Sequence, residues 1–76
     1  MNVVDALIEG VTQDIIAYLV EDRAIEVEEA MIIFYRSVLC EKLLNKITGL
    51  YRESSAYLYE LLKDELADGK FIQKEI

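Results

Sequence analysis

With 76 residues, the chain has room for one domain and one hydrophobic core. Hydrophobic residues make up 54% of the sequence, which is a high share for so short a chain. A net charge of −7, with only eight scattered lysines and arginines, argues against nucleic acid or an anionic membrane as a partner. The lack of histidine removes the usual general base and metal ligand, and a single cysteine excludes an internal disulfide. No apolar run approaches the roughly 20 residues of a membrane span. We therefore expect a cytoplasmic, non-catalytic protein without a cofactor or metal.

The composition predicts helices, because the chain has no proline, only three glycines, and abundant leucine, isoleucine, glutamate, alanine and lysine. The apolar positions recur with a helical period in three segments, near residues 3–21, 27–44 and 55–67. We expect an all-α fold in which residues 1–76 form one small bundle of three main helices, packed antiparallel around residues 31–39.

The first predicted helix begins after Asn2, a good N-cap residue. Ile16 and Val20 lie outside its main apolar arc and suggest a second contact surface. Gly10 either marks a close approach of two helices or is simply tolerated at a small cost. The main arc contains Val3, Val4, Leu7, Ile8, Val11, Ile15, Tyr18 and Leu19.

The central segment, residues 27–44, is apolar nearly all the way round when it is drawn as a helix. Met31 and Ile33 point to roughly opposite sides of it. A helix of this kind must be covered on more than one side. We expect the flanking helices and a second protein surface to provide this cover, with Ile33 among the contact residues.

Ser37 interrupts the central segment, because its hydroxyl can bond back to a carbonyl and bend the helix. The sequence is compatible with one helix that continues to Leu44 or with two helices joined near Ser37. Glu26 precedes the segment as a weak N-cap.

Ser54 is the predicted N-cap of the third helix, and Gly69 is placed to follow its C-terminus. Tyr59 points away from the inner face of this helix, so it is either a contact residue or a residue at the edge of the core. The tail, residues 70–76, is too short for an independent element.

Four blocks of the sequence resemble a group of short helical bacterial proteins of unknown function: IEVEEA (25–30), FYRS (34–37), TGLYRES (48–54) and YLYELL (57–62). Related small proteins can be encoded beside toxin-like genes. The chain departs from the group's pattern at Glu26, where Ser or Thr is usual, and at Ser55, where Pro is usual. The resemblance implies a helical fold and provides no catalytic residues.

The sequence contains three weaker candidates for chemistry. Cys40 lies among apolar residues with no histidine to activate it, which predicts a buried, inert thiol. Glu60 and Asp64 are one helical turn apart, but helical metal sites of this type also use a Glu-x-x-His pair, which is missing. Residues 52–55 could hold an anion at a helix N-terminus, although helix capping explains the serines equally well.

Two functions from different classes remain. The first is an interaction module that forms a homodimer through apolar helix faces, with Ile16, Val20, Ile33 and Tyr59 as candidate interface residues. The second is a small-molecule or metal-binding protein with a pocket between helices. A narrower form of the first is an antitoxin-like partner of a toxin. A bend at Ser37 that lets a monomer bury all of its apolar surface would argue against self-association.

Overall fold

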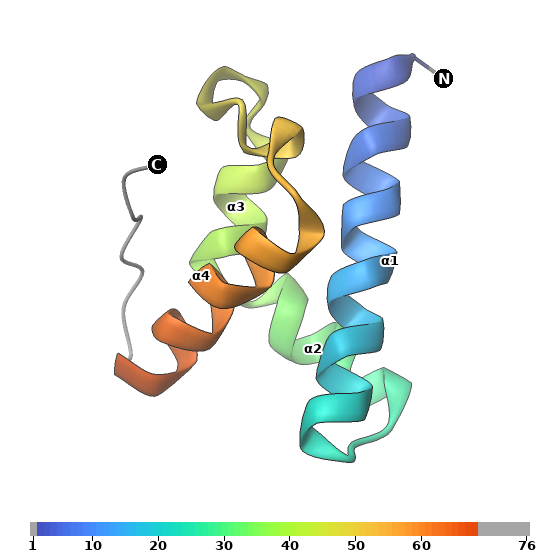
Figure 1. Ribbon diagram of the computed structural model, residues 1–76, viewed down its shortest axis with the longest axis vertical. Coiled ribbons are helices and arrows are strands. Elements are labelled where there is room, and N and C mark those ends of the chain that lie inside the picture. The colour runs from blue at the N-terminus through green and yellow to red at the C-terminus, as the bar shows by residue number, and fades with distance from the viewer. Residues whose placement is uncertain (1, 69–76) are drawn as a thin grey trace.

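The described part of the chain, residues 2–68, folds into α-helices joined by short turns, as the computed structural model in Figure 1 shows. No strand occurs in this range, so the predicted all-α class is confirmed. The elements are α1 (Val3–Arg23), α2 (Val27–Tyr35), α3 (Val38–Leu44), the 3₁₀ turns η1 (Lys46–Thr48) and η2 (Leu50–Arg52), and α4 (Ser55–Asp68).

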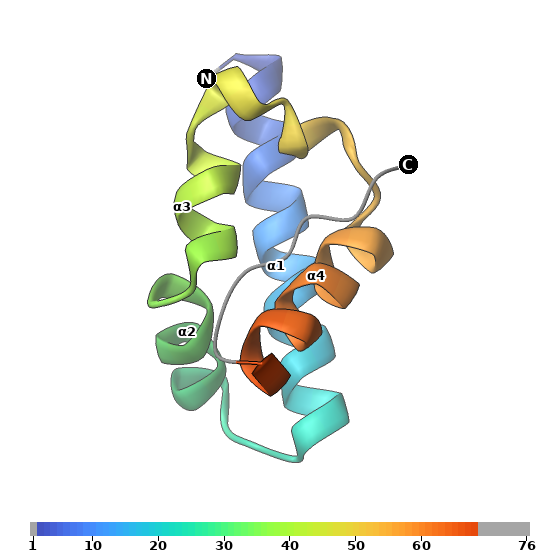
Figure 2. The same cartoon turned by 90° about the vertical axis from the view of Figure 1, so that its left-hand side faces the viewer.

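The helices form an antiparallel bundle. After α1, the chain reverses and passes through α2 and α3 in succession, and α4 then reverses direction again (Figure 1). Figure 2 shows α2 and α3 on one side of α1 and α4 on the other. The helix α1 contacts both α2 and α4, and α3 contacts α4. This is the predicted small bundle, with its central helix divided in two.

The core combines the apolar stripes of all four helices. On α1 the predicted stripe is buried at Ile8, Val11, Ile15 and Leu19, whereas Val3 is 74% exposed. The largest fully buried side chains are Ile15, Leu19, Phe34, Leu39, Leu43, Leu58, Leu61 and Leu62.

Ser37 divides the central segment, which confirms the two-helix alternative. Its hydroxyl donates a hydrogen bond to the Phe34 carbonyl at the end of α2 and accepts one from the Cys40 N–H at the start of α3. One side chain thus ends the first helix and caps the second, since Ser37 itself has an extended backbone with φ −79° and ψ 152°.

A carboxylate from α4 also caps α3. The backbone N–H groups of Val38 and Leu39 donate to the two oxygens of Glu65, over 2.8 and 3.0 Å. These N–H groups have no partner within their own helix. The bonds therefore tie the break in the central segment to the last helix of the bundle.

The two predicted N-caps are confirmed. Asn2 Oδ1 accepts the N–H of Asp5 at 2.8 Å, and Ser54 Oγ accepts the N–H of Tyr57 at 3.1 Å. Glu26 precedes α2 without a side-chain cap bond, as expected for a weak N-cap residue.

Ser55 has a tertiary role that its sequence position does not reveal. Its hydroxyl donates to Asp14 of α1 at 2.6 Å, which links α4 to α1. The expectations for Gly69 and for the tail, 70–76, lie outside the described residues.

The first helix ends at Arg23, and the C-cap residue Ala24 that follows it adopts the left-handed conformation with φ 54°. Within the same helix, a Cβ added at Gly10 would meet nothing within 4 Å. The suggested close approach of helices at Gly10 is therefore wrong, and this glycine is simply tolerated.

Candidate functional site

The outer side of α2 carries large apolar side chains that no described element covers. Val27, Met31, Ile32 and Tyr35 are 50%, 40%, 53% and 56% exposed. Ala30 and Phe34, which lie opposite Ile32 on the same helix, are buried in the core. The central segment is apolar on all sides because one side of α2 forms part of the core and the other side forms an exposed apolar surface.

Met31 lies at the centre of this surface, because it lines three neighbouring hollows. One hollow, of about 530 Å³, lies between α1 and α2 and is also bordered by Ile16, Val20 and Val27. A second, of about 550 Å³, extends from Met31 to Leu44 of α3. The third, of about 460 Å³, runs along α2. We define the Met31 face as Ile16, Val20, Val27, Met31, Ile32, Tyr35 and Leu44.

Charged side chains stand at both ends of the exposed side of α2. Glu28 and Arg36 line the third hollow together with Met31, Ile32 and Tyr35. Within residues 2–68, neither Glu28 nor Arg36 forms an ion pair. Both charged side chains are exposed at the ends of this apolar surface.

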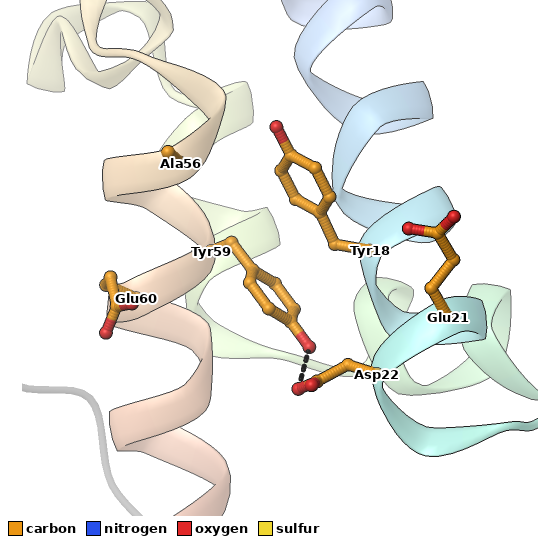
Figure 3. Close-up of a pocket in the computed structure, with 6 residues that line it drawn as sticks. All are labelled: Tyr18, Glu21, Asp22, Ala56, Tyr59 and Glu60. Atoms are coloured by element: carbon orange, nitrogen blue, oxygen red, sulfur yellow. Dashed lines mark hydrogen bonds between the residues drawn. The ribbon is translucent and has the colours of Figure 1, made fainter.

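A second candidate site lies between α1 and α4, where Tyr18 and Tyr59 meet (Figure 3). Their ring centroids are 5.3 Å apart with a tilt of 51°. The Tyr59 hydroxyl donates to Asp22 Oδ2 at 2.7 Å, as the dashed line in Figure 3 shows. An open hollow of about 470 Å³ beside them is also lined by Glu21, Ala56 and Glu60.

The chemistry of this second site is that of a structural contact. Burial raises the pKa of Tyr59 to about 12, and the hydrogen bond to Asp22 adds to the shift. The phenol therefore keeps its proton at neutral pH and joins α4 to α1. Its acceptor is a carboxylate, so the bond is charge-assisted.

The structure separates the four candidate interface residues. Ile16 and Val20 lie together on the Met31 face, at the hollow between α1 and α2. Ile33 is partly buried and packs against the core. Tyr59 is only 8% exposed and faces α1. The exposed residues of α2 were not singled out from the sequence, since a helix that is apolar all round does not reveal which side the bundle covers.

Cys40 and Glu60, two of the weaker candidates for chemistry, have surroundings that give them structural roles. Cys40 is 4% exposed, and burial raises the pKa of its thiol, which disfavours the reactive thiolate. Among residues 2–68, no group of three or more Cys, Asp or Glu side chains is arranged to hold a metal ion. Glu60 pairs instead with Lys63 at 3.0 Å.

The comparisons with protein families, curated proteins and solved structures find no match for this chain. Within the described range, no helix combines the length and the apolar character needed to cross a membrane.

Proposed function

We propose that this protein is a non-catalytic interaction module that self-associates as a homodimer through the Met31 face, in the cytoplasm. The observation that supports the proposal is the exposure of Val27, Met31, Ile32 and Tyr35 by 40 to 56% on one side of one helix. Contiguous apolar surface of this kind typically marks a contact with another protein. Closed two-fold dimers are the commonest way to cover it.

The bend at Ser37 leaves apolar side chains of α2 exposed. It turns α3 toward α4, where Leu39 and Leu43 are fully buried, but it leaves the outer side of α2 uncovered by any described element. The explanation in which a bent monomer buries all of its apolar surface therefore does not account for this helix.

A single charge placed at the centre of the face tests the proposal. Sedimentation equilibrium at micromolar to millimolar concentration should show a dimer for the native chain and a monomer for Met31→Glu, because a carboxylate buried without a partner is strongly unfavourable. Met31 is 40% exposed in the isolated chain, so the substitution should leave the helical circular dichroism unchanged.

The matched control is Ile47→Glu. Ile47 is 95% exposed and lies in η1, outside the Met31 face. This variant should dimerise as the native chain does. A native chain of monomer mass throughout the concentration range would refute self-association, and the search would then turn to a different protein partner, including the antitoxin-like case.

A further inference from the structure

We infer that two copies of the chain pair through α2 in an antiparallel arrangement, with the two-fold axis at Ile32. This inference rests on the proposed self-association and specifies its geometry. A two-fold interface uses the same patch on both copies, so the patch must be complementary to itself. The exposed side of α2 meets this condition.

The charges along α2 have opposite signs on the two sides of Ile32. Glu28 lies four residues before Ile32 and Arg36 four residues after it, and all three side chains are exposed. On a helix, residues four apart lie on the same face. In an antiparallel pair centred on Ile32, the Arg36 of each copy therefore lies against the acidic first turn of the other, Glu28 and Glu29.

The apolar residues fit the same arrangement. Ile32 is opposite the buried Ala30 and Phe34, so it projects farthest from the core, and the two copies of Ile32 meet at the axis. In this register Tyr35 of one copy lies beside Glu29 of the other, because residues equally far before and after Ile32 face each other across the two-fold axis.

A parallel pair of α2 helices lacks these attractive contacts. In a parallel pair, Glu28 would face Glu28 and Arg36 would face Arg36, so like charges would meet at both ends of the contact. The chain carries a net charge of −7, and the Arg36 contacts are the attractive pairs that counter this general repulsion at the interface.

Charge reversal tests the predicted pairs. Arg36→Glu alone and the double variant Glu28→Lys/Glu29→Lys alone should each weaken the homodimer about tenfold, because like charges then face each other twice. An equal mixture of the two variants should form a heterodimer, since both contacts become attractive. The amount of heterodimer can be measured by native mass spectrometry.

Lys42→Glu is the control for this mixture. Lys42 is exposed on α3 and borders none of the hollows, and its reversal changes the net charge as much as Arg36→Glu does. Mixed with the lysine variant, it should form at least severalfold less heterodimer than Arg36→Glu. Equal amounts would show that the effect comes from net charge alone and would overturn the inference.

Cross-linking tests the axis directly. Under oxidised glutathione, Ile32→Cys should form a disulfide-linked dimer, because the two sulfurs meet at the axis. Val27→Cys should not, although Val27 and Ile32 are 50% and 53% exposed, because its two copies would be separated by about 15 Å along the helix axes. If Met31→Glu abolishes the dimer while Val27→Cys cross-links as readily as Ile32→Cys, self-association stands and the antiparallel geometry is wrong. A monomeric native chain overturns both.

Discussion

At the scale of single residues, Tyr59 shows how position changes chemical behaviour. Its ring packs on Tyr18, its hydroxyl bonds to Asp22, and Lys63 Nζ lies 5.3 Å from its ring centroid. A phenol in this setting loses its proton only at high pH. The residue therefore contributes to the contact between α1 and α4 under all physiological conditions.

The pH dependence of Tyr59 can be measured. Because its pKa is raised from 10 in the unfolded chain to about 12 in the folded one, its stabilising contribution is complete below pH 10 and is lost as the pH rises toward 12. A titration followed by absorbance at 295 nm should show one of the five tyrosines ionising late. Tyr59→Phe should remove this late step, and its persistence in the variant would assign the shift to another tyrosine.

Among residues 2–68, Ala24 is the non-glycine residue with a positive φ. Its φ of 54° and ψ of 45° lie in the left-handed region, which costs an alanine about 1 kcal/mol. Glycine is the usual residue at this position after a helix. Ala24→Gly should therefore raise the free energy of unfolding by about 1 kcal/mol.

Denaturant unfolding followed by circular dichroism measures this change. Ala6→Gly is the control, since Ala6 is exposed within α1, where glycine should instead lower the stability by about 1 kcal/mol. A loss of stability in both variants would show that the backbone at Ala24 is not strained.

At the scale of helices, the ends of the elements depend on side-chain caps. Asn2, Ser37 and Ser54 each bond to a backbone N–H three residues on, which is a local interaction. Residues near in sequence supply both partners, so such caps can be predicted. The additional cap on α3 comes from Glu65, 27 residues after Val38.

Glu65→Ala should lower the stability by about 1 to 2 kcal/mol, because it leaves two N–H groups at the start of α3 without their acceptor. Glu60→Ala is the matched control on the same helix. Glu60 makes only an exposed ion pair with Lys63, for which a loss of about 0.5 kcal/mol or less is expected. Equal losses in thermal or denaturant unfolding would contradict a capping role for Glu65.

At the scale of the whole molecule, the described helices enclose one core and leave one large apolar face. The core is held by α1 packing on α2 and α4, while the Met31 face extends over α1, α2 and α3. A surface of this kind links the stability of the fold to the concentration of the chain if the dimer forms only from folded copies.

The midpoint of thermal unfolding should therefore rise with protein concentration. Over a hundredfold range, the native chain should gain several degrees, because mass action favours the folded dimer. Met31→Glu should show no such dependence. If the thermal unfolding midpoint of the native chain is the same at every concentration, folding is not coupled to dimerisation.

The sequence by itself determined the elements of this protein. Helical periodicity located the helices, and the predicted stripe of α1 contains the core residues Ile8, Val11, Ile15 and Leu19 together with the exposed Val3 and Leu7. Ser37 indicated a break in the central segment as one of two alternatives, the other being a continuous helix. These features depend on residues within a few positions of one another, which is why a single chain reveals them.

Only the tertiary structure decided which sides of the helices are covered. The central segment is apolar all round, and the direction of the chain after Ser37 determines that Phe34 is buried whereas Ile32 is 53% exposed. The same long-range packing places Glu65 at the start of α3 and Tyr59 against Asp22. Burial and tertiary hydrogen bonds join residues far apart in sequence, so local patterns do not contain them.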